Sequence, residues 1–346
     1  MPITPSAPQV TARRRAACLA ELAQGTERFH EPRREDCPWC GSGRLRTRFS
    51  APDLLQRRPG RFTVDVCRDC AHVFQNPRLT PEGLAFHSRY PQPDLAHAER
   101  ARRRLRATAR SMLAYGEPES WLDVGTGDGD FPAIAREFFP YTAFDGMDPT
   151  PRVLKARAAG RVEEAHVGHL TTRGTTARLR SRYDVVSLLH QLHRTPDPRA
   201  DLRAALSLLR PGGVLLIELP DPTSPLAPLL GRWWLPHTQP RHLHLIPPAN
   251  LLAELRSQGC AILRTDRDHL PHDLVTAATL ALSHALPPQD APWRPTPPTA
   301  LQRHVRTALT HATAPLAAAA VAADHTLAPL LRHTPLANTY RVIAHR

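Results

Sequence analysis

Short apolar runs alternate along the chain with stretches that have helical periodicity. The runs predict strands at residues 120–124, 141–148, 164–167, 183–189, 214–219, 261–264 and 339–344. Runs such as 183–189 are apolar almost throughout, as expected of strands that are buried on both faces. Helices are predicted at residues 131–135, 152–159, 202–209 and 251–258. Strands that alternate with helices in this way predict an α/β fold with a doubly wound, parallel sheet.

The segments outside this alternation have other patterns. Residues 61–66 alternate apolar and polar side chains like a strand, and Thr80 followed by Pro81 predicts the start of a helix. Residues 96–110 are helix-prone and rich in arginine, which is typical of a solvated helix face. Residues 271–335 are rich in Ala, Leu, Pro and His and predict helices inserted before the last strand.

Composition and charge narrow the class of protein. The chain has 346 residues, 41% of them hydrophobic, so it can bury the core of one large domain or of two ordinary ones. The formal net charge of +13 is uneven: 21 Arg against 11 acids give +10 over residues 1–110, 13 Arg and Lys against 14 acids give −1 over 111–220, and 11 Arg against 7 acids give +4 over 221–346. The neutral middle excludes a uniformly basic nucleic-acid binder but leaves room for a basic accessory module.

Two alanine-rich runs are too short to span a bilayer. Glu21 ends the run of residues 16–20, and Asp324 and His325 end the run of residues 315–323. Both fall well below the roughly 20 residues that a membrane helix needs, and no export signal is apparent. We therefore expect a soluble, cytoplasmic protein with no membrane partner.

Four of the six cysteines form two C-x-x-C pairs. Cys37 and Cys40 are followed after 26 residues by Cys67 and Cys70. Two such pairs can place four thiolates tetrahedrally around one ion, and Zn²⁺ in a closed, structural site fits this pattern best. Iron bound by the same four ligands is the alternative, whereas disulfides are disfavoured in a cytosolic chain. The sequence thus predicts a small zinc ribbon at residues 31–78, with Cys18 and Cys260 as ordinary buried residues.

A glycine-rich turn follows the strand at residues 120–124. Gly125, Gly127 and Gly129 let the backbone turn sharply and approach a ligand, and the helix that follows offers unpaired N–H groups. The next strand ends in Asp148, 19 residues past Gly129, where a nucleotide-binding β-α-β unit places the carboxylate that binds ribose hydroxyls. Asp123, ahead of the first glycine, and the glycine spacing separate this motif from the G-x-G-x-x-G of dehydrogenases.

Together these segments resemble the class I S-adenosylmethionine-dependent methyltransferases. The matching residues are Leu122–Gly129, Gly146–Pro149, Tyr183–Val186 with His190–Pro198, and Leu209–Leu215, and the likeness covers roughly residues 100–265 and, by implication, the last strand. The resemblance implies a Rossmann-like methyltransferase sheet with a final antiparallel strand, and S-adenosyl-L-methionine as cofactor. In the family the first acid contacts the amino-acid end of the cofactor, the glycines pass beneath it and the second acid binds the ribose. The cofactor-binding residues expected on this basis are Asp123, Gly125, Thr126, Gly127, Gly129, Asp148, Pro149, His169, Leu170 and Leu189.

The N-terminal part has a resemblance of its own, and two segments depart from the family. Residues 67–77 are similar to the ribbon ending of bacterial zinc-ribbon methyltransferases, many of which act in natural-product or sugar pathways. Where the family often has an acid after the third strand, this chain has Gly168-His169-Leu170. Where many members have Leu-Glu-His after the fourth strand, it has Leu192-His193-Arg194. The contacts to adenine therefore stay unassigned.

Three histidines are candidates for a general base. His190 and His193 follow the fourth strand, at the carboxyl edge of the sheet where ligands bind. His242 belongs to the segment 240–243, which resembles a Pro-x-His-Leu element of the family. Trp233 and Trp234 could wall an acceptor pocket beside it; the alternative is that they pack in the core and that His242 bonds to backbone.

We therefore predict an enzyme that methylates a small-molecule acceptor, in specialised, natural-product biosynthesis. One alternative is a methyltransferase of ribosomal or transfer RNA that holds RNA with its basic N-terminal region; few aromatic residues and no Asn/Asp-Pro-Pro-Tyr/Phe motif argue against it. A second alternative is a catalytically silent binding protein with the cofactor fold. The expected parts are an N-terminal extension (1–30), the ribbon (31–78), a helical connector (79–110) and the methyltransferase domain (111–346), which includes the helical insertion at 271–335.

Overall fold

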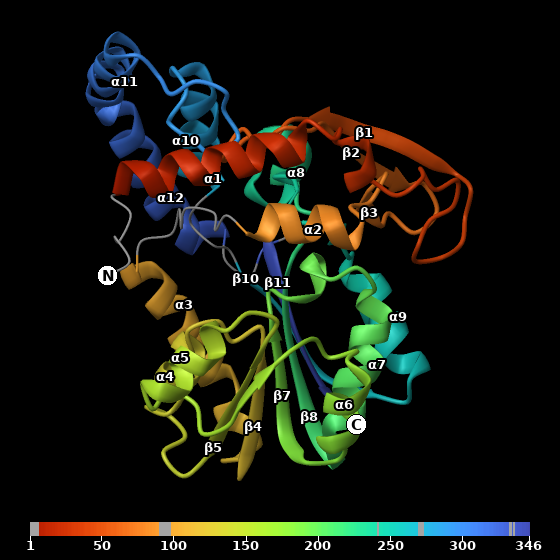
Figure 1. Cartoon of the computed structure of the whole chain (residues 1–346). Helices are drawn as coiled ribbons and strands as arrows, with labels where there is room; N and C mark the ends of the chain where they lie inside the picture. The colour runs from red at the N-terminus through yellow and green to blue at the C-terminus, as the bar shows by residue number, and fades with distance from the viewer. Residues whose placement is uncertain (1–6, 90–97, 241, 269–272, 332–333, 335) are drawn as a thin grey trace, which may run out of the picture. The chain divides into compact units, whose positions relative to one another are not determined.

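The chain forms two compact units, each built from three segments. Our computed structural model describes residues 7–89, 98–240, 242–268, 273–331, 334 and 336–346. Unit 1 comprises Met1–Pro93, Leu226–His242 and Pro271–Pro329, and unit 2 comprises Asp94–Pro225, Leu243–Leu270 and Leu330–Arg346 (Figure 1). The domains predicted from the sequence are contiguous stretches of the chain, and their boundaries stay a prediction.

Unit 2 contains a seven-stranded sheet in the order β10-β11-β8-β7-β4-β5-β6. The strands are β4 (Ser120–Val124), β5 (Ala143–Asp148), β6 (Ala165–Val167), β7 (Tyr183–Leu189), β8 (Leu209–Pro220), β10 (Ala261–Asp268) and β11 (Thr339–His345). The strands from β4 to β8 pair in parallel, whereas β11 runs antiparallel to both β8 and β10. The doubly wound sheet and the final antiparallel strand predicted from the sequence are confirmed.

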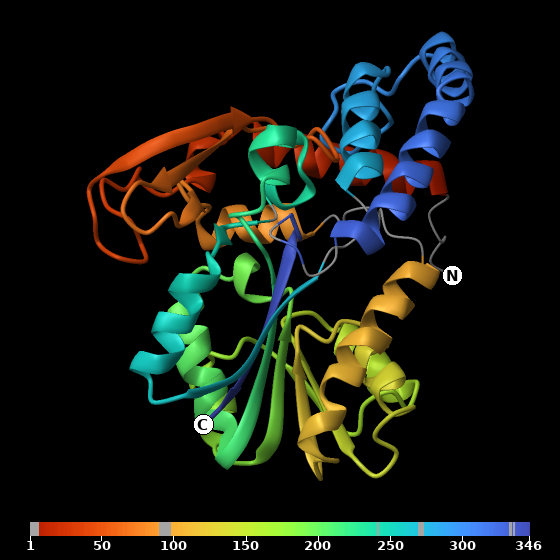
Figure 2. The same ribbon diagram turned by 180° about the vertical axis from the view of Figure 1, so that it is seen from behind.

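Helices cover both faces of this sheet, as Figures 1 and 2 show. One face carries α3 (Ala98–Ser111), α4 (Asp130–Ala135) and α5 (Arg152–Ala158), and the other carries α6 (Arg173–Arg178), α7 (Pro198–Leu208) and α9 (Pro248–Ser257). Short elements join them: the 3-10 helices η2 (Leu113–Tyr115) and η3 (Leu192–Arg194), and the strand β9 (His244–Leu245). In the core, Trp121 packs against Phe131, Phe139 and Phe144 and donates its indole N–H to Ser187 Oγ at 3.0 Å.

Helix α7 differs from its predicted bounds. It begins at Pro198 rather than at residue 202, because Asp197 caps it: the carboxylate accepts a hydrogen bond from the Ala200 N–H at 2.9 Å. It ends at Leu208, and β8 then runs through Pro211, Gly212 and Gly213, which the sequence pattern placed at a helix end. An early start for α7 puts Asp201 in a regular helix, one turn from its beginning.

Unit 1 combines a small antiparallel sheet with helices. Its strands pair in the order β1 (Leu45–Ala51), β2 (Phe62–Cys67) and β3 (Val73–Gln75). Its helices are α1 (Ala7–Leu22), η1 (Glu27–Phe29), α2 (Pro81–Ser88), α8 (Leu226–Leu230), η4 (Gly231–Trp233), η5 (Leu235–His237), α10 (Asp273–Ala285), α11 (Ala300–Ala312) and most of α12 (Ala314–Leu331). The predicted start of α2 is confirmed, because the Thr80 hydroxyl accepts a hydrogen bond from the Gly83 N–H at 3.1 Å. Strand β1 and helix α1 were not predicted.

The expectation that Asp324 and His325 end the alanine-rich run is wrong for the helix. Helix α12 continues through both residues to Leu331 and, by length and composition alone, could cross a membrane. Asp324 is buried within the protein. Its carboxylate accepts hydrogen bonds from the Leu274 and Val275 N–H groups at 3.1 and 2.7 Å. These bonds cap the first turn of α10 and tie the two helices together.

Candidate active site

The glycine-rich turn after β4 adopts the backbone that only glycine favours. Gly125, Gly127 and Gly129 have φ values of 78°, 55° and 78°, in the left-handed region. The Gly125 and Thr126 N–H groups donate to the Met147 carbonyl at 2.8 and 3.1 Å, which fastens the turn to the end of β5. A Cβ at Gly125 would lie 2.5 Å from Gln191 Oε1. A side chain at this position would be strained by the positive φ and would force Gln191 to move.

Asp148, at the end of β5, is held by the same turn. Its Oδ2 accepts a hydrogen bond from the Gly127 N–H at 3.0 Å, and its Oδ1 accepts from the Thr150 N–H at 2.8 Å and from the Thr150 hydroxyl at 2.5 Å. Two carboxylate oxygens offer about four acceptor positions, so three bonds orient the group and leave capacity for a ligand donor. This geometry fits a carboxylate that binds the hydroxyls of a ribose.

Asp123, in β4, is almost completely buried. The Ser187 hydroxyl donates a hydrogen bond to Asp123 Oδ1 at 2.7 Å. Burial raises the pKa of Asp123 to about 7, and the negative charge of Asp148 adds to the rise. An acid with such a pKa responds to the charge of any ligand group placed beside it.

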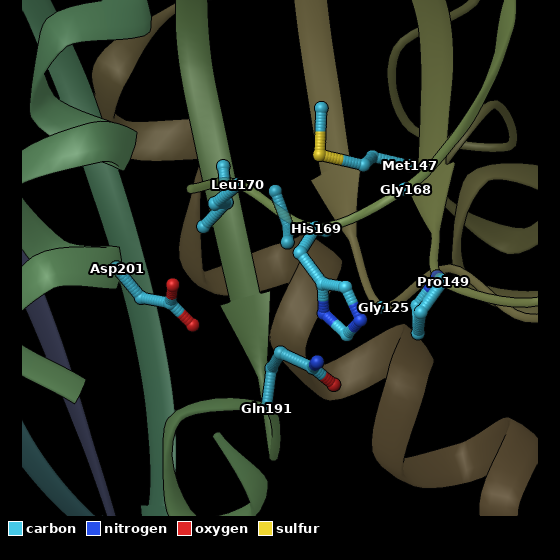
Figure 3. A pocket seen from close by; sticks show the side chains of 9 residues that line it. Gly125, Met147, Pro149, Gly168, His169, Leu170, Gln191 and Asp201 are labelled. Carbon is cyan, nitrogen blue, oxygen red and sulfur yellow. The ribbon is translucent and has the colours of Figure 1, made fainter. Parts of the chain in front are cut away.

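A small hollow lies beside the turn, at the carboxyl ends of β4 and β5. It is lined by Val124, Gly125, Met147, Pro149, Gly168, His169, Leu170, Gln191 and Asp201 (Figure 3). Four predicted cofactor residues are thus brought together here: Gly125, Pro149, His169 and Leu170. Thr126, Gly127 and Gly129 complete the adjoining turn, whereas Leu189 packs against the apolar core of the sheet. Gln191 and Asp201 were not predicted.

His190 is paired with an acid that the sequence pattern did not single out. Its Nε2 lies 3.1 Å from Glu218 Oε1, and its backbone is held at φ 53° with its N–H donating to the Glu218 carbonyl at 2.8 Å. The other carboxylate oxygen of Glu218 accepts from Arg341 at 2.9 Å and from the Thr108 hydroxyl at 2.8 Å. Glu218 is buried within β8, and the signal that could have found it is an acid inside the apolar run 214–219.

This network sets the charges of the pair. Burial alone would raise the pKa of Glu218, but the hydrogen bond from His190 and the charge of Arg341 outweigh it and hold that pKa well below its usual range. Burial lowers the pKa of His190, and the bond to Glu218 opposes this only in part. Glu218 is therefore ionised and accepts, so the neutral imidazole donates its Nε2–H and keeps its lone pair on Nδ1.

The other two candidate histidines have different surroundings. His193 is buried, and its ring centroid lies 5.9 Å from that of His190, edge to face. His242 belongs to unit 1, where its Nδ1 lies 3.0 Å from the Pro236 carbonyl oxygen. Trp234 is completely buried and donates its indole N–H to Asp273 Oδ1 at 2.9 Å, which suits a core residue better than a pocket wall.

In unit 1 the four paired cysteines converge. Their sulfur atoms all lie within 4.8 Å of one another, with 3.6 Å between Cys37 and Cys70 and 3.6 Å between Cys40 and Cys67. Zn–S bonds of about 2.3 Å in a tetrahedron require sulfur atoms roughly 3.8 Å apart. The cluster therefore fits a zinc ribbon, with β2 leading into the second cysteine pair.

Comparisons with known proteins agree with this geometry. Residues 96–265 match the model of a methyltransferase-domain family. The ubiquinone biosynthesis O-methyltransferase of Azotobacter vinelandii is 30% identical over 148 residues, which are 41% of this chain and 64% of that protein. The enzyme of the same name from Salmonella newport is 30% identical over 154 residues, 42% of this chain and 62% of that protein.

The relatives and the solved structure named here match only part of this chain. The chain spans less than two thirds of the length of both curated relatives. A solved S-adenosylmethionine-dependent methyltransferase from Archaeoglobus fulgidus has 17% sequence identity and a TM-score of 0.45, and the match covers 71% of this chain and 94% of that one. Residues 96–265, which match the methyltransferase-domain family, carry the parallel strands from β4 to β8, the glycine turn and Asp148, and this part of the chain has the features of a class I S-adenosylmethionine-dependent methyltransferase.

Proposed function

We propose that the protein is an S-adenosyl-L-methionine-dependent methyltransferase that acts on a hydroxyl group of a small molecule. The observation that carries the proposal is the placement, at one edge of the sheet, of the glycine turn, Asp148 and the His190–Glu218 pair. In open α/β sheets ligands bind at this carboxyl edge. Both cofactor and acceptor would therefore find their partners there.

The residues present fit the cofactor. Asp148 would bind the ribose, Gly125, Thr126, Gly127 and Gly129 would pass beneath the amino-acid end, and Asp123 would contact it. Pro149, His169 and Leu170 would line the space for the base. When bound, the cofactor supplies an activated methyl group, so the protein has to align the acceptor and exclude water.

His190 is the base that we assign to the acceptor. With its Nε2–H donated to Glu218, the Nδ1 lone pair is the one available to take the hydroxyl proton. His190 would take that proton as the hydroxyl oxygen is methylated, with S-adenosylhomocysteine as the leaving group, and the ionised Glu218 would stabilise the imidazolium that results. His193, edge-on to His190, would orient the acceptor; His242, the third candidate, has no assigned step.

Further features support the small-molecule reading. The curated relatives are named O-methyltransferases of ubiquinone biosynthesis, which agrees with a hydroxyl acceptor. Resemblance to zinc-ribbon methyltransferases supports a role in natural-product biosynthesis. A Zn²⁺ ion in the four-cysteine cluster would be structural, and four reduced thiols suit a cytoplasmic location.

Calorimetric titration with S-adenosylmethionine and S-adenosylhomocysteine tests the cofactor. We expect micromolar binding by the wild-type protein and a large loss in Asp148→Ala, because the ribose hydroxyls lose their acceptor. A folded sample that binds neither compound would refute the proposal.

Methyl transfer from labelled cofactor to a panel of hydroxylated small molecules tests the chemistry. His190→Gln is expected to slow transfer by about 10²- to 10⁴-fold, the range for a lost general base, while leaving cofactor affinity unchanged. Glu218→Gln is expected to slow it less and to shift the acidic limb of the pH–rate profile to lower pH, because the group that raises the pKa of His190 is gone. Equal rates in wild type and His190→Gln would rule out this base.

A further inference from the structure

One buried carboxylate beside the hollow has no role in the proposed reaction. Asp201 of α7 lines the hollow next to Leu170 and Gln191, and Figure 3 shows its carboxylate directed toward the space between them. The residue is 8% exposed, and burial raises the pKa of Asp201 to about 6, although a hydrogen bond from the Thr195 side chain opposes the rise. Among the residues that the structure describes, no cation pairs with it. Burying an acid without a cation costs folding free energy, so a purely structural role explains it poorly.

The position of Asp201 on its helix makes the same point. Residues 198, 201, 202, 205, 206 and 208 form the buried face of α7, and Asp201 is the single charged member of that set. An aliphatic residue there would fill the same face without the cost of desolvating an acid. A bound ligand should therefore interact with this carboxylate.

The hollow has two different ends. Pro149 and Gly125 lie on one side of His169, next to Asp148, whereas Asp201 lies on the opposite side (Figure 3). The adenosyl group of the proposed cofactor is also two-ended: the ribose carries the hydroxyls, and the far edge of the purine carries an exocyclic amino group. With the ribose at Asp148, the purine edge would extend toward Asp201.

The segment after β6 places no carboxylate at the hollow. His169 and Leu170 stand there, with Gly168 before them. We infer that Asp201 of α7 accepts a hydrogen bond from the exocyclic amino group of the purine and thereby selects an adenine-type base. The inference rests on the proposed function and names the part of the site that reads the base.

Binding of two ligands tests this without turnover. The probes are S-adenosylhomocysteine and its 6-deamino analogue, which has hydrogen in place of the amino group and is otherwise the same. For the wild-type protein we expect the amino compound to bind about tenfold or more tightly, as for a hydrogen bond to a charged acceptor. In Asp201→Ala the two affinities should become nearly equal, and in Asp201→Asn, which keeps an uncharged acceptor, the ratio should be intermediate.

Asp148→Asn is the matched control. It removes charge from the other end of the hollow, so both ligands should weaken together and their ratio should stay at the wild-type value. Asp201→Ala could lose the preference for the amino compound because it misfolds. Asp201→Asn excludes this explanation if it keeps the wild-type melting curve and still shows a reduced ratio. A wild-type ratio retained in both Asp201 variants would overturn the inference and leave the proposed function standing. Failure of the wild-type protein to bind S-adenosylhomocysteine at all would overturn the proposed function, and the inference with it.

Discussion

At the scale of single residues, the raised pKa of Asp123 predicts that cofactor affinity depends on pH. In the free protein the carboxyl group loses its proton near pH 7, because burial disfavours the charged form. The amino-acid end of the cofactor carries an ammonium group, which favours the charged form. Affinity should therefore rise as the pH increases through about 7, and binding below that pH should release a proton from Asp123.

Calorimetry between about pH 5.5 and 8.5, in buffers with different ionisation enthalpies, measures both effects. Asp123→Asn serves as the control: it can keep the hydrogen bond from Ser187 but does not titrate. Its affinity should be lower at pH 8 and flat across the range. A pH dependence that survives unchanged in Asp123→Asn would assign the titration to another group.

At the scale of elements, the contact between the glycine turn and α5 predicts a measurable crowding effect. A Cβ at Gly129 would lie 2.9 Å from the Ala156 Cβ, and the residue also has φ +78°. Gly160, just after the C-terminal end of α5, has φ +68°, but a Cβ added there would meet nothing within 4 Å. Gly160→Ala should lower the free energy of unfolding by about 1 kcal/mol through strain alone, and Gly129→Ala by about 2–4 kcal/mol through strain and crowding. Urea unfolding of both variants measures the two losses in the free energy of unfolding. Equal losses would show that α5 can move away from the added methyl group without destabilising the protein.

The ribbon is a second element whose stability should depend on one ligand set. Cys67→Ser removes one of four converging sulfur atoms, so bound metal should fall from one ion per chain to nearly none, and unit 1 should melt at lower temperature. Cys18→Ser, a buried cysteine outside the cluster, should keep its metal. Elemental analysis identifies the metal, and a reddish, iron-loaded sample would contradict the assignment to zinc.

At the scale of the whole molecule, Arg341 joins parts of the chain that are far apart in sequence. It binds Glu218 of β8 at 2.9 Å and the Thr108 hydroxyl of α3 at 2.9 Å, with little exposure. Arg341→Met should destabilise the protein by about 3–5 kcal/mol, because Glu218 would stay buried without its cation. Arg210→Met, which breaks a half-exposed pair with Asp184, should cost about 1 kcal/mol or less. Urea unfolding compares the two, and similar losses would mean that water reaches Glu218.

Some elements of the fold could be predicted from the sequence and others could not, according to whether burial left a recognisable hydrophobic pattern. Strands such as β7 and the core of β8 are buried on both faces and so leave an apolar run that is easy to recognise. Strand β1 was missed because its side chains are mostly polar and only partly buried, and its pairing with β2 stabilises it instead. The same difference applies to the site residues. The glycine turn could be recognised because its residues are consecutive in the sequence. The His190–Glu218 pair and the burial of Asp201 could not, because they arise only when elements far apart in the sequence pack together.

The division into units has a consequence for how the protein is made. Three segments of one unit alternate with three of the other, so the chain passes between the units five times. On the ribosome, β8 emerges long before its neighbour β11, and it has to wait while residues of both units are synthesised. No single gene boundary, proteolytic cut or fusion point separates the units. Separating the two units would require a break at each of the five points where the chain passes between them.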